Sequence, residues 1–264
     1  MSLLPGIFSP VKKCPMKRTT NPALLCILLC FSLYSAHAQQ YPKYEFGINL
    51  GFTVYQGDLT PQQLGSFKTQ KLAVGLQAAK LLSSSWSVRA ALLRGRLKGD
   101  DALYANPEYR QQRNFNFRTP VTEFTGQLVW NPLGRNYADK GFSPYFFAGA
   151  GLAFLRINRD WSGLNSSYFN SESSTIFSGL ATDTTHSVPR VIPVIPVGMG
   201  IKYFFTPKLG MNAEAAYRLG YTDYLDGFSE AANPAKKDHY LNYSVGVIYR
   251  TGKKNMLKCP KMRY

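Results

Sequence analysis

Eight stretches of this chain alternate between apolar and polar residues, and this period of two limits the possible fold more than any other feature. From Tyr44 to Gln56 every second residue is apolar, and the alternation returns from Leu209 to Thr222. Such a period gives a β-strand one apolar and one polar face. The predicted strands span residues 44–56, 71–81, 86–96, 118–131, 143–157, 190–205, 209–222 and 239–250. We therefore expect an all-β protein.

The connections between these strands alternate in length. The turns span 82–85, 132–142 and 206–208, and the longer loops span 57–70, 97–117, 158–189 and 223–238. An even number of strands with short turns on one rim and long loops on the other is typical of outer-membrane barrels. A soluble barrel of the lipocalin type lacks this asymmetry. The pattern predicts an eight-stranded antiparallel transmembrane β-barrel with short periplasmic turns and long extracellular loops.

Aromatic residues gather at both ends of the predicted strands. Those at the short-turn ends are Tyr44, Trp86, Trp130, Tyr145, Tyr203, Phe205 and Tyr249. Those toward the long-loop ends are Phe52, Tyr55, Phe117, Phe154, Tyr217 and Tyr221. Aromatic residues favour strands in general, but this preference does not explain their position at the ends. Two aromatic belts at the two headgroup levels of a bilayer do explain it.

The first 38 residues are predicted to be a signal peptide that directs the chain to the outer membrane. Lys17 and Arg18 precede an apolar run at 23–34, and Ala36-His37-Ala38 is a typical cleavage motif. The run is shorter than the roughly 20 residues that a membrane helix needs. Either Met1 or Met16 can be the start of translation.

Cleavage there would leave a barrel at 39–250 and a tail at 251–264. Three of the four cysteines lie within the first 38 residues, so we expect no disulfide. The tail is basic, and it can bind an acidic periplasmic partner or lipid headgroups. A solvated, unstructured end fits the same composition. Its candidate partner contacts are Lys253, Lys254, Lys258, Lys261 and Arg263.

In a membrane barrel the polar faces of the strands point inward. Eight strands enclose a lumen that side chains can fill, and buried charges persist when they are paired. We therefore expect ion pairs rather than an open pore, with Glu45 beside Arg250 and Glu214 beside Lys202. The predicted interior network consists of Glu45, Arg89, Glu123, Arg156, Lys202, Glu214, Arg218 and Arg250.

The formal net charge is +16, which in an intracellular protein would suggest nucleic acid as a partner. An exported barrel has no nucleic acid to bind, and much of its charge collects around the second long loop. We expect these side chains to contact lipopolysaccharide phosphates at the outer rim, with generic surface charge as the alternative. The predicted contacts are Arg94, Arg96, Lys98, Arg110, Arg113 and Arg118.

Several segments, taken in order, point to one family. They are Tyr55-Gln56-Gly57-Asp58-Leu59, Gly99-Asp100-Asp101, Arg113-Asn114-Phe115-Asn116-Phe117, Trp130-Asn131-Pro132-Leu133, the stretch from Ser143 to Gly149 and the stretch from Ile195 to Tyr203. Across roughly 44–250 the chain resembles the DUF6089-type outer-membrane barrels, which include the PorG-like component of type IX secretion. The resemblance implies a small outer-membrane barrel that docks periplasmic secretion subunits. From the residues themselves we expect a non-enzymatic, structural or accessory barrel of a Gram-negative outer membrane. It supplies no catalytic residues.

A lipid-modifying enzyme is one alternative that the residues leave open. Asp183, His186 and Ser187 lie together in the third long loop, and such a set can activate a hydroxyl nucleophile. Because triad geometry depends on the fold, proximity in sequence is weak evidence, and we expect no catalytic site. The sequence contains no motif for a phosphate, metal or cofactor site. Asp58, Asp100 and Asp101 are read as turn-forming residues.

A receptor or adhesin is the other alternative. Long loops on a rigid barrel often carry binding residues. The 158–189 loop is the candidate element, and its aromatic anchors would be Trp161, Tyr168, Phe169 and Phe177.

Overall fold

The computed structural model describes residues 42–62, 65–169, 173–220, 224–232 and 238–252. The predicted signal peptide at 1–38 and the five basic residues of the tail lie outside these ranges. Within the described residues, no helix is both long and apolar enough to cross a membrane.

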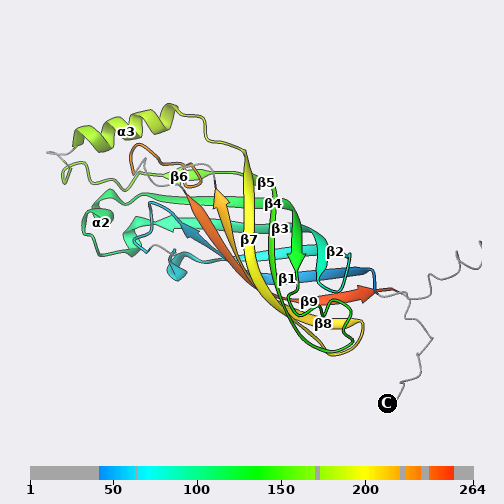
Figure 1. Cartoon of the computed structure of the whole chain (residues 1–264). Helices are drawn as coiled ribbons and strands as arrows, with labels where there is room; N and C mark the ends of the chain where they lie inside the picture. The colour runs from blue at the N-terminus through cyan, green and yellow to red at the C-terminus, as the bar shows by residue number, and fades with distance from the viewer. Residues whose placement is uncertain (1–41, 63–64, 170–172, 221–223, 233–237, 253–264) are drawn as a thin grey trace, which may run out of the picture.

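Eight long antiparallel strands form a closed barrel (Figure 1). They are β1 (Tyr44–Gln56), β2 (Lys71–Leu81), β3 (Trp86–Asp100), β4 (Asn116–Trp130), β5 (Gly141–Leu155), β7 (Val191–Phe204), β8 (Leu209–Gly220) and β9 (His239–Thr251). Each strand pairs with its neighbour in the chain, and β1 pairs with β9 from Tyr44↔Thr251 to Gln56↔His239 to close the barrel. The predicted eight-stranded antiparallel barrel is confirmed.

Strand bounds differ from the prediction mainly at the long-loop rim, the end of the barrel that carries the longer connections. The third strand continues to Asp100 rather than residue 96, and its partner β4 begins at Asn116. Lys98 faces Arg118 and Asp100 faces Asn116, so backbone pairing between β3 and β4 continues to the end of both strands. The hairpin therefore projects beyond the alternating segment from which the strands were predicted.

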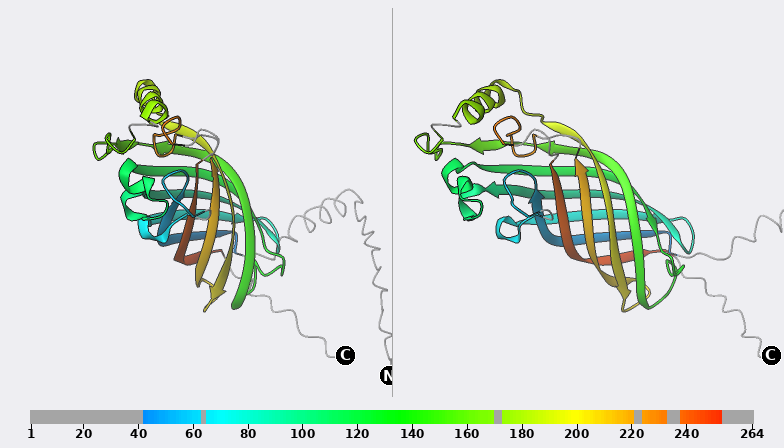
Figure 2. Two further views of the ribbon diagram at one scale, coloured as in Figure 1. Left: turned by 90° about the vertical axis from the view of Figure 1, so that its left-hand side faces the viewer. Right: turned by 60° about the vertical axis from the view of Figure 1, so that its left-hand side comes forward.

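The long connections carry structure of their own beyond the barrel mouth. They contain the short helices η1 (Phe67–Thr69), η2 (Asp101–Leu103) and α2 (Tyr109–Arg113), the short strand β6 (Asn158–Asp160) and the helix α3 (Ser173–Thr185). Both views in Figure 2 place α3 over the long-loop end, at the opposite end of the barrel from the end of β9. We did not predict α3, because its Ser/Thr-rich sequence has low helix propensity. Its inner face is formed by Ile176, Leu180 and Asp183 at helical spacing.

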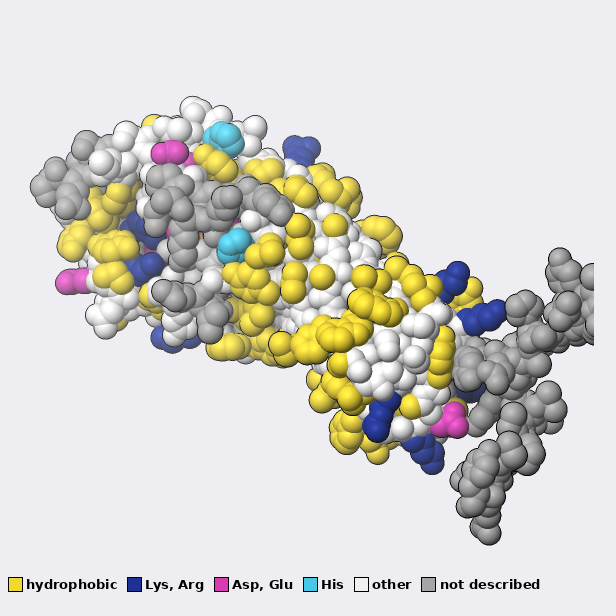
Figure 3. All heavy atoms as spheres, viewed as in Figure 1, with side chains coloured by type: hydrophobic (Ala, Val, Ile, Leu, Met, Phe, Trp, Pro, Cys, Tyr) yellow, Lys and Arg dark blue, Asp and Glu magenta, His cyan; other side chains and the backbone are white. Residues whose placement is uncertain are grey.

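Apolar side chains cover the outside of the barrel, as a bilayer requires. Phe124 is 60% exposed and Ile48 63%, whereas the intervening Glu45 and Glu123 are almost fully buried. Figure 3 shows hydrophobic side chains along the barrel wall, with Lys and Arg toward its two ends. The barrel therefore has the outward-facing apolar surface of a transmembrane protein.

Three of the predicted belt aromatics face inward instead. Tyr55 and Phe117 are buried at the long-loop end, and Tyr145 is buried near the short-turn rim, the opposite end of the barrel. Tyr55 and Phe117 pack edge to face, with ring centroids 4.7 Å apart. The strand that carries Tyr145 is apolar on both faces, so alternation does not reveal which of its sides faces lipid. Tyr221 lies outside the described residues.

The interior of the barrel at the long-loop end is an apolar core, which we call the cap core. It combines strand residues with residues of the loops and of α3 that fold over the mouth. Its members include Tyr55, Leu59, Leu97, Phe115, Phe117, Leu180, Leu225, Phe228 and Tyr240. A second, smaller cluster of Val129, Tyr145, Phe147 and Ala216 lies toward the short-turn rim. Charged residues occupy the interior beside and between these clusters.

Candidate functional site

The first group of interior charges is built around Glu45 on β1. Its carboxylate accepts from Nζ of Lys202 on β7 at 2.5 Å and from Nε of Arg250 on β9 at 2.9 Å. Arg250 also donates to the carbonyl of Ala138 at 2.8 Å and lies 3.3 Å from the ring centroid of Phe204. Glu45 faces Arg250 directly in the β1–β9 register, as the sequence indicated. One carboxylate thus ties together three strands, among them the first and the last.

The second group crosses the lumen from β3 to β8. Arg89 donates to Glu214 at 2.6 Å, to Gln77 at 2.8 Å and to Gln127 at 2.7 Å. Tyr145 donates its hydroxyl to the same carboxylate at 2.6 Å. The predicted bridge between Glu214 and Lys202 is therefore wrong. In the β7–β8 register Glu214 faces Gly200, and Lys202 instead reaches Glu45.

The third group links β8 to β4 beneath the cap core. Arg218 donates to Glu123 at 3.3 Å, and the hydroxyl of Tyr240 donates to the same carboxylate at 2.6 Å. Cavities of about 40 Å³ and about 10 Å³ remain in the interior around Arg89. A water molecule needs at least about 10–15 Å³, so each of these cavities holds very few waters.

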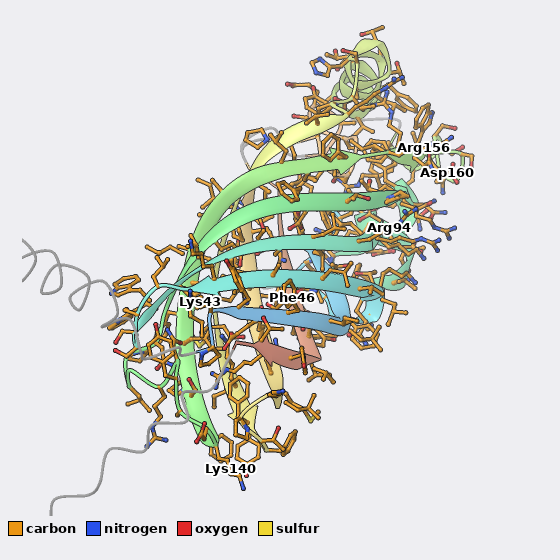
Figure 4. The ribbon with its side chains drawn as sticks, turned by 90° about the vertical axis from the view of Figure 1, so that its right-hand side faces the viewer. Lys43, Phe46, Arg94, Lys140, Arg156 and Asp160 are labelled. Atoms are coloured by element: carbon orange, nitrogen blue, oxygen red, sulfur yellow. The ribbon has the colours of Figure 1, made fainter. Side chains whose placement is uncertain are left out.

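Arg156 does not join the interior network. It is exposed just beyond the end of β5, with the same parity as the outward-facing Leu152 and Phe154. The prediction that Arg156 faces the interior is wrong, because the two apolar faces of this strand give no parity signal. Figure 4 shows Arg156 at the same end of the barrel as Arg94 and Asp160, away from Lys43 and Lys140.

Two of the six cations predicted to contact lipopolysaccharide are buried instead. Arg113 donates to Asp101 at 2.6 Å, and Arg110 donates to the same carboxylate at 3.0 Å. The short helix α2 turns both side chains inward toward Asp101, which is fully buried. Burial lowers the pKa of Arg113, but the hydrogen bond and the charge of Asp101 outweigh it and raise that pKa overall. These arginines therefore fasten the loop to the barrel and are not available to lipid.

The other four cations lie where an outer ligand can reach them. Arg94, Arg96 and Arg118 are exposed on the outward faces of β3 and β4. Lys98 is half-buried and pairs with Asp100 at 2.9 Å.

The three residues considered for catalysis do not assemble into a triad. Asp183 is fully buried and accepts backbone N–H groups from Ser229, Glu230 and Ala231 at 2.9–3.1 Å. The ring of His186 stacks on Tyr224 with centroids 4.3 Å apart. Among the described contacts, none joins Asp183 to His186 or Ser187. Asp183 anchors α3 to the loop before β9.

The proposed aromatic anchors of the 158–189 loop divide into two kinds. Phe169 is buried, and Trp161 packs edge to face on Phe228 of the cap core. Tyr168 and Phe177 remain exposed. Two of the four are thus already engaged within the protein.

A buried cluster at the long-loop end has no signal in the sequence pattern. The hydroxyl of Tyr55 lies 2.8 Å from Oδ2 of Asp226 and 2.6 Å from Oδ1 of Asp238, and both aspartates are fully buried. Asp238 also accepts the N–H groups of Leu225 and Asp226 at 3.1 and 3.4 Å. Both aspartates lie in the 223–238 loop, where alternation gives no information about burial.

Several solved outer-membrane barrels are similar in structure to this chain at low sequence identity. Ail, the attachment invasion locus protein of Yersinia pestis, was solved with the heparin analogue sucrose octasulfate. It is 12% identical, with 80% of this chain and 99% of that chain covered and a TM-score of 0.40. Neisserial surface protein A is 14% identical, with 79% and 97% covered and a TM-score of 0.41. The N-terminal barrel domain of Pseudomonas aeruginosa OprF is 10% identical, with 80% and 99% covered and a TM-score of 0.39.

No curated protein matches the sequence. The family model described as "Domain of unknown function (DUF6089)" matches residues 22–251, a range that contains every strand of the barrel. This match confirms the family to which the quoted sequence segments pointed. The chain is a member of the DUF6089 family.

Proposed function

We propose that this protein is a non-enzymatic outer-membrane barrel with a structural or accessory role, and that it does not conduct ions. The observation that carries this proposal is the filled lumen. Three ion-pair groups join strands across the interior, and the cap core lies over them. An ion would have to separate paired charges in a low-dielectric interior, which is costly.

Planar-bilayer recording of the purified protein tests this proposal. We expect no stable, large conductance at either polarity. A matched variant, Arg89→Ala with Glu214→Ala, removes the central bridge and is expected to raise the frequency of brief openings. A large, steady conductance from the unaltered protein would overturn the proposal.

The same proposal places the protein in the outer membrane, exported by its N-terminal segment. The apolar outer wall and the polar interior support this location. Membrane fractionation and detergent extraction are the tests, and we expect recovery with the outer membrane only. Recovery as a soluble monomer without detergent would contradict the location.

We further propose that the periplasmic side docks subunits of a type IX secretion machine. The support is the resemblance noted in the sequence, together with the basic residues Lys253, Lys254, Lys258, Lys261 and Arg263. Pull-down of the tagged barrel followed by mass spectrometry should recover periplasmic secretion subunits. Deletion of 251–264 should reduce that recovery, whereas replacing Lys140 and Lys208 at the same rim should not. Undiminished recovery without the tail would remove the tail from the proposal.

A surface receptor is the second candidate, supported by the exposed rings of Tyr168 and Phe177 beyond the barrel mouth. Exposed aromatic residues on a rigid support often anchor a partner. Recovery of an extracellular ligand in the same pull-down, lost in a Tyr168→Ser/Phe177→Ser variant, would favour this candidate. A ligand that binds this variant as well as the unaltered protein would argue against it.

A further inference from the structure

Five cations cluster on the outward faces of β3, β4 and the end of β5, at the edge of the apolar wall. We call Arg94, Arg96, Lys98, Arg118 and Arg156 the cationic patch. In the β3–β4 register Arg96 faces Pro120, and the carbonyl of Pro120 accepts the N–H of Arg156, so the two arginines flank this proline. One step closer to the rim, Lys98 directly faces Arg118. Like charges directly opposite each other in a sheet are destabilising.

The charges of this patch are largely uncompensated within the protein. Lys98 pairs with Asp100. Among the described residues, the guanidinium groups of Arg94, Arg96, Arg118 and Arg156 make no hydrogen bond or ion pair. By contrast, Arg110 and Arg113 of the nearby loop share a buried carboxylate. These four guanidinium groups are exposed, unpaired and on adjacent strands, so they are available to bind an anion from outside the chain.

The patch lies at the height where lipid headgroups would lie. From Trp130 to Thr122, which is level with Arg94, the β4 strand climbs eight residues. This is roughly 27 Å along the strand and about 21 Å along the barrel axis at a tilt of about 40°. The apolar belt of an outer-membrane barrel is about 25 Å tall. Arg94 thus lies about 4 Å short of the edge of the hydrocarbon on the long-loop side, and Arg96, two residues further along β3, lies at that edge.

An apolar groove crosses the wall below the patch, from Tyr44 on β1 to Ala150 on β5, and so includes the strands that carry the patch. Small residues line its part on β3 to β5, where Ala90 faces Gly126 and Gly126 faces Ala150 across adjacent strands. A Cβ added at Gly126 would meet no atom within 4 Å. Ala90 lies four residues from Arg94, about 13 Å along the strand. An acyl chain can therefore lie in the groove and pass the exposed side chains of Leu92 and Phe124, while its headgroup contacts the arginines.

We propose that the patch and the groove form a binding site for an outer-leaflet lipid that carries more than one phosphate. Guanidinium groups bind phosphate oxygens in bidentate fashion. Along β3 the patch extends over three outward-facing positions, roughly 14 Å, and across the sheet it extends over three strands, roughly 10 Å. This area is large enough for two phosphate groups. Compared with the six lipopolysaccharide contacts predicted from the sequence, the site includes Arg156 and omits the buried Arg110 and Arg113. It rests on the proposed outer-membrane location of the barrel.

The test is lipid binding by the full chain purified in mild detergent, measured by native mass spectrometry. The probes are bisphosphorylated lipid A, the same lipid without phosphates, phosphatidylglycerol and inorganic phosphate. The patch variant is R94Q/R96Q/R118Q/R156Q. The control K43Q/K80Q/K140Q/K208Q removes the same charge from exposed positions toward the short-turn rim. A charge-retaining variant, R94K/R96K/R118K/R156K, separates bidentate binding from simple charge.

We expect the patch variant to bind the bisphosphorylated lipid about tenfold less than the unaltered protein, because several charge-assisted hydrogen bonds are lost together. The control should bind normally, and the lysine variant should fall between. Equal binding by the patch variant, or equal binding of the lipid without phosphates, would overturn the site. Displacement of the lipid by millimolar inorganic phosphate would also overturn the lipid assignment.

Heat-modifiability on gels shows whether each variant forms the barrel. If the fourfold variant does not fold, the pairs R94Q/R96Q and R118Q/R156Q replace it, and each should reduce binding severalfold. A protein that proves soluble without detergent would refute the outer-membrane location. A folded, membrane-located barrel with unchanged lipid binding would refute only the site.

Discussion

At the scale of single residues, Arg89 shows how a charged side chain is accommodated inside a barrel surrounded by lipid. Its guanidinium group contacts one carboxylate and two amide oxygens, and it lies 4.4 Å from the ring centroid of Phe147. Desolvation of both charges opposes the ion pair, and the added hydrogen bonds offset this cost. The stability of the pair therefore depends on all its partners being present.

Replacing Arg89 with Met should be strongly destabilising, because Glu214 would remain buried without its cation. The expected loss is about 3–5 kcal/mol in the free energy of unfolding. The double variant Arg89→Met/Glu214→Leu should regain part of this loss, since no charge is left unpaired. Urea unfolding in lipid vesicles, followed by tryptophan fluorescence, measures both. A double variant no more stable than the single one would contradict this account, and Lys80→Met is the exposed control.

Two strand glycines should respond in opposite ways to the same substitution. A Cβ at Gly51 would lie 2.0 Å from the carbonyl oxygen of Tyr243 on the neighbouring strand, whereas one at Gly126 would meet open space. Gly51→Ala should cost about 1–3 kcal/mol by overpacking. Gly126→Ala should be neutral or stabilising by about 0.5–1 kcal/mol, because alanine loses less backbone entropy on folding. The same unfolding assay compares them, and equal effects would be inconsistent with the barrel register.

At the scale of elements, α3 and the loop before β9 are held together by one carboxylate. Asp183 satisfies three consecutive backbone N–H groups, and Leu180 on the same helical face packs into the cap core. Buried N–H groups are costly to leave unpaired. The helix therefore acts as a clamp on the 223–238 loop although its sequence is a poor helix former.

Asp183→Ala should loosen this clamp without opening the barrel. Each N–H group left unpaired costs about 1–3 kcal/mol, so the loop should become sensitive to protease while the strands remain paired. Proteinase K digestion with mass spectrometry should detect new cleavage within 223–238, and heat-modifiability should be unchanged. The exposed Thr184→Ala is the control on the same helix. Cleavage at the control rate would show that Asp183 does not hold the loop.

Strand alternation in the sequence was sufficient to predict the eight strands, their connections and most interior charges. It failed where alternation carries no information. The strand after residue 141 is apolar on both faces, so Tyr145 and Arg156 were placed on the wrong sides. In the loops, burial depends on tertiary contacts, so nothing in the sequence distinguished the buried Arg113 from the exposed Arg118. The partner of Glu214 depends on reach across the lumen, which strand order alone does not reveal.

At the scale of the whole molecule, the orientation of the apolar wall toward lipid can be tested by where a charge is tolerated. Ala90 lies near the middle of the wall, and Leu72 lies near the long-loop rim, two residues from Val74, which pairs with Arg94. Arginine at the bilayer midplane of a barrel costs about 2–4 kcal/mol, falling to about 0–1 near the interface.

Ala90→Arg should therefore be destabilising and Leu72→Arg nearly neutral, as measured by unfolding and refolding in lipid vesicles. In detergent micelles, which adapt around a charge, the difference between the two variants should shrink. Equal stability of both variants in vesicles would mean that this wall does not face hydrocarbon.

The interior ion pairs also have a consequence for biogenesis. Glu45 lies on the first long strand, whereas its partners Lys202 and Arg250 lie on the sixth and the eighth. Arg89 lies on the third, and its partner Glu214 lies on the seventh. A nascent chain that has released only its first hairpins thus carries orphan charges on the surface that will become the inside. These charges must stay in contact with water or with another protein until the last hairpin has been added. Insertion of one strand at a time into the lipid hydrocarbon is therefore disfavoured.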